Sequence, residues 1–304
     1  MSNLILLFLC LFLGVFLRKA KLFPENGHLA LNSFVVNISL SSLSLYYIPK
    51  IAMNVQVLFP VAVQWLNILL AIPFFILIGR KLKWSKGMIG AVIMGAGLGN
   101  SSFIGIPVIH ALYGESGMKT VMLVDQPGGF VALFTVGIAV ANYFSGGKST
   151  ASETILKIIK YPPFIAFSIA VLLNVFSLQI PTDLDQVFEK LGATTVPLAL
   201  VSVGSQLRWQ KFNSETRPLL LALSFKLLLF PLIIFVLYFF VFNQRGEMIE
   251  ISFLEAGMAP MITAGIIANT HHLYPKLTNL IIGIGIPISF VTLAFWYFVM
   301  HYFI

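Results

Sequence analysis

Charged side chains are the first thing that this chain lacks. Asp, Glu, Lys and Arg make up only 10% of its 304 residues, while 58% are hydrophobic and the mean hydropathy is +0.94. Soluble domains carry about 25% charged residues, so this composition excludes a protein with a water-facing surface all round. The chain is therefore expected to be an integral membrane protein that crosses the bilayer many times.

Cysteine is scarce too, and no cleavable leader is expected. The single cysteine, Cys10, excludes an intrachain disulfide. The first apolar run, residues 4–17, has no basic residue before it, whereas Arg18, Lys19 and Lys21 follow it. A secretory signal peptide has the opposite order of charge, so we expect this run to be a membrane span.

Motifs for enzymatic chemistry are lacking as well. There is no H-E-x-x-H motif, and the glycines of residues 95–99 match no dinucleotide fingerprint. His271 and His272 invite a metal site with Glu255, but no further ligands occur at a recognisable spacing, which favours residues at a helix end. The sequence predicts no catalytic residue, no metal and no cofactor.

The net charge of +8 is distributed unevenly along the chain. With the spans given below, 14 of the 19 Lys and Arg residues fall in one set of alternate loops and four in the other, while Lys226 lies inside a span. The positive-inside rule then places both termini outside and the basic loops in the cytoplasm. This distribution excludes nucleic acid as the reason for the positive charge.

Hydrophobic runs and turn residues predict an all-α protein with ten transmembrane helices. The expected spans are 3–17, 30–48, 57–78, 87–113, 120–143, 161–179, 190–207, 218–242, 248–272 and 278–302.

The longest connection, residues 145–160, is expected to be a cytoplasmic linker between two repeats, 1–144 and 161–304. Each repeat has five spans, and an odd number means that the second repeat enters the membrane inverted. Residues 153–160 are expected to form either a short amphipathic helix on the membrane surface or a solvated linker.

The fourth span contains residues that weaken a helix. Four glycines, an asparagine and two serines lie between Gly95 and Pro107. Main chain opened in lipid must be buried in protein or line a wet cavity, so we expect a discontinuous helix. Pro107 would lie in the first turn of its second half, with Ser101 or Ser102 as the cap. The alternative is a kinked helix with a glycine-rich packing face.

The ninth span repeats this pattern in the second repeat. It reads Glu255-Ala256-Gly257-Met258-Ala259-Pro260, again with a proline just past the weak point. Two broken helices of opposite orientation would cross near the midplane and direct their half-helix ends at one place. Half-helix N-termini present free N–H groups and positive potential, so a central transport site is predicted there.

The motif of residues 99–107, GNSSFIGIP, followed by ALYG at 111–114, resembles that of the auxin efflux carrier family. Residues 255–260 and 196–200 resemble the family's second crossover and its seventh span, so the likeness covers essentially the whole chain. The resemblance implies a ten-helix fold like that of bile acid–sodium symporters. In that fold, spans 1, 2, 6 and 7 form a scaffold and the other six form a moving core, an elevator arrangement with crossover helices.

The resemblance also implies carriage of organic anions, such as malate or malonate in bacterial members and indole acids in plant members. The short linker is similar to that of bacterial members, which implies a bacterial inner membrane. The chain departs from the family at Ser41, where a proline is usual, and this leaves the local scaffold geometry and a substrate contact open.

The predicted substrate-binding residues are concentrated at the two breaks. Asn100 has an amide that can donate to a carboxylate, and the family's crossover asparagine falls on this position. The alternative is an asparagine that only bonds a neighbouring helix. The full predicted set is Asn100, Ser101, Ser102, Gly105, Pro107, Ala259, Pro260 and Lys226.

Three ionisable residues fall inside spans, where charge is costly and usually functional. Lys226 is expected to balance an anionic substrate or to pair with Glu255 or Asp125, unless it snorkels to the cytoplasmic surface. Glu255 is interpreted as a proton carrier or cation ligand, or as one partner of a structural ion pair. Asp125 is a second candidate for ion coupling, or a cap of the fifth span beside Pro127.

The sequence thus predicts a secondary active transporter of a small organic anion, working by alternating access. An intramembrane enzyme using Asp125, Glu255 and the two histidines, or a receptor without transport, is the alternative. The expected partners are the anion, membrane lipid and a proton or sodium ion, while uniport and a homodimer stay open.

Overall fold

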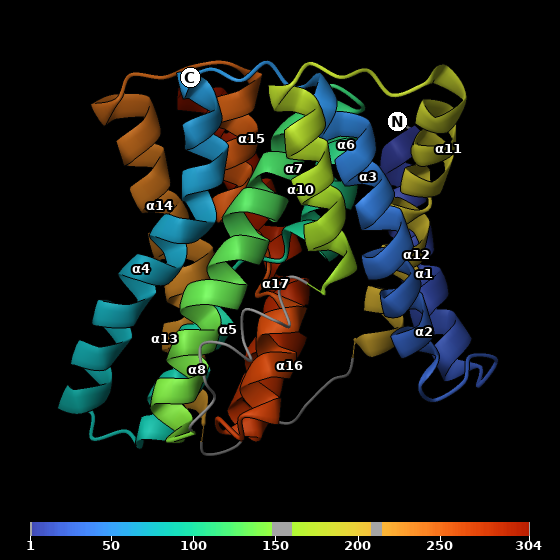
Figure 1. Ribbon diagram of the computed structural model, residues 1–304. Coiled ribbons are helices and arrows are strands. Elements are labelled where there is room, and N and C mark those ends of the chain that lie inside the picture. Colours follow the sequence, from blue (N-terminus) through green and yellow to red (C-terminus); the bar gives the residue numbers. More distant parts are fainter. Residues whose placement is uncertain (1, 148–159, 208–214, 304) are drawn as a thin grey trace.

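The computed structural model describes residues 2–147, 160–207 and 215–303, and these form an all-helical protein (Figure 1). Seven helices are long and apolar enough to cross a membrane: Ser2–Lys19, Gly27–Lys50, Val55–Lys81, Met118–Ser145, Thr182–Gln206, Thr216–Val241 and Pro275–Phe303. Three shorter apolar helices accompany them: Lys86–Ala96, Ser101–Tyr113 and Pro162–Val175. The fold class of an α-helical membrane protein is thereby confirmed.

Several of the long helices are built from shorter α-helices joined by π-helical turns. In the first half these are α1 (Ser2–Lys19), α2 (Gly27–Phe34), α3 (Leu40–Tyr47), α4 (Leu58–Lys81), α5 (Lys86–Ala96), α6 (Ile106–Tyr113), α7 (Met118–Leu123) and α8 (Ile138–Ser145). The π-helical turns η1 (Val35–Ser39), η4 (Ser101–Gly105), η5 (Val124–Phe130) and η6 (Leu133–Gly137) lie between them.

The second half begins after the predicted linker, most of which, residues 148–159, lies outside the described residues together with nearly all of the expected amphipathic helix. Its helices are α10 (Pro162–Val175), α11 (Thr182–Ala193), α12 (Thr195–Gln206), α13 (Thr216–Ser224), α14 (Phe230–Phe235), α15 (Glu247–Ala256), α16 (Ile262–Thr270) and α17 (Pro275–Phe303). The turns η7 (Phe225–Leu229) and η8 (Val236–Val241) flank α14.

The predicted start of the seventh span was wrong. Its helix begins at Thr182, eight residues before the expected position 190, because Pro181 precedes the helix and Asp183 and Asp185 lie in its first turn. Acidic residues stabilise the positive N-terminal end of a helix, so these residues extend the helix rather than form a loop.

One group of helices packs around α1 and α12. Figure 1 shows α1, α2, α3, α11 and α12 gathered at one side of the molecule. Gly14 of α1 and Gly204 of α12 face each other, and a methyl group on either would collide with main-chain atoms of the other helix. Small residues allow this close approach of two membrane helices. Farther along, α10 and α11 pack on α3.

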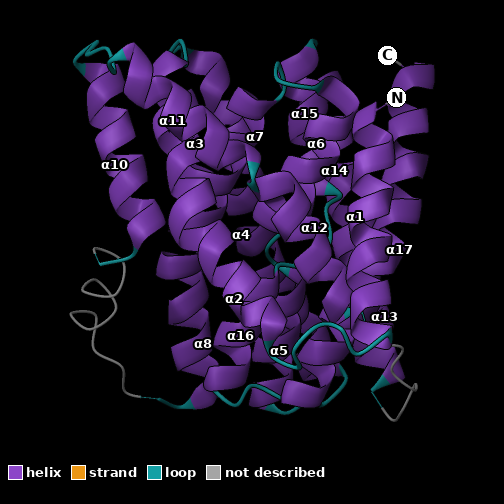
Figure 2. Cartoon of the chain, turned by 90° about the vertical axis from the view of Figure 1, so that its right-hand side faces the viewer, coloured by secondary structure: helices purple, strands orange, loops and turns teal. Residues whose placement is uncertain are grey.

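The remaining helices form a second group that contains the short helices α5, α6, α15 and α16. Aromatic contacts contribute to its packing; for example, the Trp296 indole meets the Phe253 ring and donates to the Leu227 carbonyl at 2.8 Å. The two termini lie at the same end of the molecule in Figures 1 and 2. Which end faces the cytoplasm stays a prediction from the loop charges.

Candidate functional site

Two helices of the second group are interrupted, and the interruptions meet. The first gap lies between Ala96 and Ser101, and the second between Ala256 and Ile262. The main-chain N–H of Asn100 donates to the Ala259 carbonyl at 2.8 Å, and the main-chain N–H of Met261 donates to the Leu98 carbonyl at 3.1 Å.

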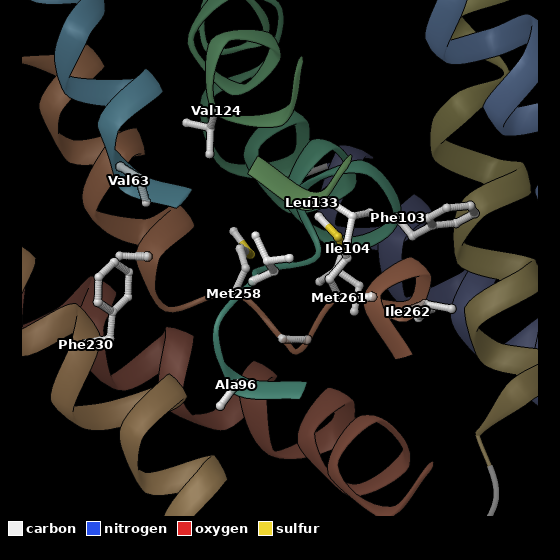
Figure 3. Packing of buried hydrophobic residues seen from close by; sticks show 14 of the residues in the cluster. Val63, Ala96, Phe103, Ile104, Val124, Leu133, Phe230, Met258, Met261 and Ile262 are labelled. Carbon is white, nitrogen blue, oxygen red and sulfur yellow. The ribbon is translucent and has the colours of Figure 1, made fainter. Parts of the chain in front are cut away.

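These bonds form one isolated antiparallel bridge between Gly99 and Pro260. Each gap therefore satisfies main-chain groups of the other, which is what burial away from water requires. Figure 3 shows the apolar side chains around this meeting point, among them Ile104, Met258 and Met261.

Asn100 caps the second half of the first broken helix. Its Oδ1 accepts from the Phe103 amide at 3.2 Å, while its buried Nδ2 has no hydrogen-bond partner among the described residues. The predicted cap, Ser101 or Ser102, was therefore wrong by one or two residues. Pro107 is the second residue of α6 and lies in the first turn of that helix, although the π-helical turn η4 precedes α6 and the second half of the broken helix therefore begins at Ser101. The missing proline donor thus falls where the helix already departs from its regular bonding.

Gln64 of α4 joins the meeting point, and the sequence analysis missed it. Its Oε1 accepts from the Gly99 amide at 2.8 Å, and its Nε2 donates to Ser101 Oγ at 3.1 Å. A Cβ at Gly99 would lie 2.8 Å from Gln64 Nε2 and 3.1 Å from Lys226 Nζ, so a side chain there would displace these two polar groups. The only signal in the sequence is one amide within an apolar span, with Asn67 one turn later.

Asn67 is fully buried, and neither its Nδ2 nor its Oδ1 has a partner within the described part of the chain. Burying an amide without partners costs free energy, so its presence one turn from Gln64 indicates a polar surface on α4. Two amides of α4, rather than one, therefore belong to the buried polar region.

Asp125 lies in the middle of its helix and does not cap it. It belongs to η5, within the continuous helix Met118–Ser145, so the capping alternative was wrong. Its Oδ1 accepts from Ser102 Oγ at 2.5 Å and its Oδ2 from Gln126 Nε2 at 2.8 Å. Ser102 thus links the first broken helix to a fully buried carboxyl group.

Glu255 ends the first half of the second broken helix and is fully buried. Its carboxyl group lies against Gly105, where a methyl group would collide with it. Neither carboxyl oxygen, however, has a partner at hydrogen-bonding geometry among the described residues. Glu255 therefore has unused capacity to bind a proton, a cation or a donor group.

Lys226, in η7, is fully buried, so it does not snorkel. Its Nζ donates to the Ala256 carbonyl at 2.9 Å, near the C-terminal end of α15, where a cation is favoured by the helix dipole. The expected ion pair with Glu255 or Asp125 does not form. The ion pairs of the described residues are Lys50–Asp185 and His110–Glu115.

Several of the polar side chains of this region are carried by π-helical turns. Ser101 and Ser102 lie in η4, Asp125 in η5 and Lys226 in η7. Such turns often occur at functional sites because they widen the helix and redirect side chains. The arrangement gathers two carboxyl groups, one amino group and several amides away from water.

The other residues singled out from the sequence lie elsewhere. His271 and His272 follow the end of α16, and no group of three or more His, Cys, Asp or Glu side chains able to hold a metal occurs in the described parts of the chain. Ser41 lies in α3, and its buried Oγ lacks a partner among the described residues. Within the described chain, no hydrogen bond joins Ser41 to the polar region.

Two adjoining cavities lie between the two helix groups at the end opposite the termini. The outer one has a volume of about 670 Å³ and is lined in part by Arg18, Lys21 and His28. The inner one, about 250 Å³, shares His28 with it and reaches Ile262, the first residue of α16. We call the two together the vestibule. It leads from a basic mouth toward the second gap.

The end that carries the termini is closed by polar contacts between the same two groups. The Tyr47 hydroxyl of α3 donates to the Glu115 carboxylate, and Asn3 Nδ2 of α1 donates to the His110 carbonyl of α6 at 3.2 Å. Within the second group, His110 Nε2 lies 3.2 Å from Glu115 Oε1, and the Tyr113 hydroxyl donates to Glu250 of α15 at 3.1 Å. The interface between the helix groups is thus hollow at one end and bonded at the other.

Comparison with known proteins shows the family to which this chain belongs. A family model described as a membrane transport protein matches residues 1–297. The chain belongs to this family. The resemblance to auxin efflux carriers read from the motif at 99–107 is thereby confirmed, and the chain is a transporter rather than an enzyme.

Several curated proteins are similar over nearly their whole length. An uncharacterized transporter of Methanothermobacter thermautotrophicus is 27% identical over 292 residues, which cover 93% of each chain. One of Methanocaldococcus jannaschii is 24% identical and covers 97% of each chain. The uncharacterized transporter YfdV of Escherichia coli is 22% identical over 98% of this chain and 96% of its own. The intramembrane enzyme considered above therefore loses its support.

Proposed function

We propose that the chain is a secondary active transporter that carries a small organic anion bearing a carboxylate. The observation that carries this proposal is the main-chain bridge at Gly99 and Pro260, where two interrupted membrane helices meet beside the buried Asn100 Nδ2, which lacks a hydrogen-bond partner in the described part of the chain. An amide donor and loose main chain inside a membrane protein are expensive unless they hold something polar. A transported carboxylate matches these donors.

In this proposal the anion lies between two half-helix N-termini. These termini are at Ser101 and Ile262, rather than immediately after Pro107 and Pro260, because α6 is preceded by η4 and α16 starts two residues past Pro260. Asn100 donates to the carboxylate, and Ser101, Ser102, Gly105 and the Ala259 main chain shape the site. Lys226 supplies the compensating positive charge.

Ion coupling is assigned to the two carboxyl groups. Asp125 and Glu255 are fully buried and outnumber Lys226, so full ionisation would leave a net negative charge where the anion has to bind. Buried charge of this kind is strongly unfavourable unless it is neutralised. A proton or a sodium ion taken up with the substrate would neutralise it, and Glu255, whose carboxyl oxygens have no hydrogen-bond partner among the residues that the structure describes, is the first candidate.

The proposed architecture is a ten-helix fold of two inverted repeats, 1–144 and 161–304, with α5 and α6 matched by α15 and α16. The helices α1, α2, α3, α10, α11 and α12 would form the scaffold, since they pack mainly on one another. The rest would move as a core. The vestibule would admit the anion from the cytoplasm, and the Glu115 contacts would break when the core moves.

This orientation places both termini outside an inner, or plasma, membrane. It follows from the loop charges and from the common end shared by the termini. A cysteine placed near either terminus should react with an impermeant thiol reagent in intact cells, and one in the Lys83 loop should not.

Uptake into proteoliposomes tests the proposal. Labelled malate, malonate and indole-3-acetate are supplied with and without a pH gradient, and with sodium or potassium outside. The expected result is saturable uptake of at least one carboxylate, which falls in Asn100→Ala and Lys226→Ala. Uptake that is normal in both variants would remove the site assignment, while uptake of none of the anions would remove the substrate class.

A further inference from the structure

A third cavity lies at the basic end of the molecule, outside the proposed transport site. It has a volume of about 580 Å³ and is lined only by α4, α13 and the residues that adjoin them. Both helices pack near or on α5, which leaves a groove between them. Figure 1 shows α4 and α13 on the side of the molecule away from α1, α2 and α12.

The groove carries two cations that have no partner among the described residues. Lys81 and Arg217 line it, both side chains are exposed, and no carboxylate of the described chain lies within ion-pair distance of either. No acidic residue lines the groove. A guanidinium group binds two oxygens of a phosphate at once, and a nearby ammonium group adds a point charge, so this pair suits a phosphate group.

The floor and the surroundings of the groove are apolar. Ile78, Leu220 and Leu221 line it beside the cations. Leu220 is 55% exposed, and apolar exposure continues along both helices, with Leu77 of α4 68% exposed and Leu228, in the turn η7 after α13, 46% exposed. Such a surface in a membrane protein faces acyl chains, whereas a free phosphate ion would make no favourable contact with it. The ligand that fits has a phosphate headgroup and a long hydrocarbon tail.

We propose that this groove binds an anionic phospholipid, with the phosphate between Lys81 and Arg217 and one acyl chain along α4 and α13. Basic pockets between membrane helices are a recurring way to hold such headgroups. The site is separate from the meeting point of the broken helices, and it does not depend on which anion is transported. With the basic end in the cytoplasm, the lipid belongs to the inner leaflet.

Lipid retention by the purified protein tests this site. The detergent-solubilised protein is titrated with phosphatidylglycerol or phosphatidylcholine, and bound lipid is counted by native mass spectrometry. We expect several-fold more phosphatidylglycerol than phosphatidylcholine on the wild-type chain. Lys81→Gln combined with Arg217→Gln should reduce phosphatidylglycerol to the phosphatidylcholine level, and inorganic phosphate at millimolar concentration should not compete.

The matched control is Lys83→Gln combined with Lys86→Gln, which removes two exposed cations from the same end that do not line the groove. This control should retain the preference. An equal loss in the control, displacement of the lipid by phosphate, or no preference in the wild type would each overturn the proposal. If the double variant does not fold, the single variants serve instead, each with a partial loss expected and an unchanged preference in both counting against the site.

The apolar part of the groove has its own test. Ser224→Trp fills the groove without changing charge, and its retention of phosphatidylglycerol should fall at least twofold while its melting temperature stays near that of the wild type. Full retention in a folded Ser224→Trp protein would show that surface charge alone attracts the lipid, and the groove would be rejected.

Discussion

The two gaps in the broken helices differ in what they supply. The first gap and the turn that follows it carry polar side chains, namely Asn100, Ser101 and Ser102. The second gap carries none in residues 257–261, and its contribution is main chain: the Ala259 carbonyl and the Met261 amide. Its charges come from Glu255 just before the gap and from Lys226 on another helix. One gap is therefore a source of side-chain ligands and the other a backbone frame.

Lys226→Met should give the largest effect, because it removes the charge on which the frame depends. It leaves the Ala256 carbonyl without its donor and the carboxyl groups without a cation. A hydrogen bond to a charged group contributes about 1.5–3 kcal/mol, so anion uptake should fall on the order of 100-fold. Lys276→Met, at an exposed helix end, is the control and should transport normally. Equal uptake by both variants would mean that Lys226 is structural.

Asn100→Ser should separate the cap from the ligand in the first gap. A serine can still accept from the Phe103 amide, so the melting temperature should change little. The amide donor is lost, and we expect uptake to fall about tenfold, with the change in KM for the carboxylate. A variant that melts early yet transports normally would reverse this assignment and make Asn100 only a cap.

Gly285→Ala should disturb the second gap by crowding Pro260. The added methyl group would lie 2.7 Å from the Pro260 ring and 2.9 Å from Leu223, so the frame has to shift. Overpacking of this kind costs about 1–3 kcal/mol of stability, which thermal unfolding in detergent would measure.

Gly87→Ala is the matched control for that experiment, since nothing lies within 4 Å of the position that its methyl group would take. Its stability should stay within about 0.5 kcal/mol of the wild type or rise slightly. Comparable losses in both alanine variants would indicate that the Pro260 segment has room to adjust.

Met261→Leu should have the smallest effect, because the second gap acts through its main chain. The amide that bonds Leu98 is retained, and exchange of Met for Leu in a packed region usually costs less than about 1.5 kcal/mol. Uptake should remain within about threefold of the wild type. A loss as large as that of Asn100→Ser would show that the second gap also provides side-chain contacts, and the distinction between the gaps would fail.

Part of the candidate site could be predicted from local sequence features. The glycines before Asn100 and the proline at 260 predicted the positions of both gaps, because glycine and proline weaken a helix whatever packs around it. The motif at 99–107 also indicated the family. What failed were details that depend on neighbours: Asn100 rather than a serine is the cap, Asp125 sits in mid-helix, and Lys226 bonds a carbonyl instead of a carboxylate.

The role of Gln64 could not be predicted from the sequence. It bonds Gly99, 35 residues away, and nothing near position 64 distinguishes it from an amide that faces another helix. The same holds for Glu255 and Gly105, which are 150 residues apart and come into contact only because the gaps cross.

By itself the sequence determined that the protein lies in a membrane, that its helices are apolar and where the two gaps fall. These features follow from hydropathy and from the way glycine and proline weaken a helix. Tertiary structure alone decided which main-chain groups of one gap satisfy the other, and which buried charges stand beside them. Those choices depend on how helices distant in the chain pack, and packing is a property of their shared surface rather than of any one segment.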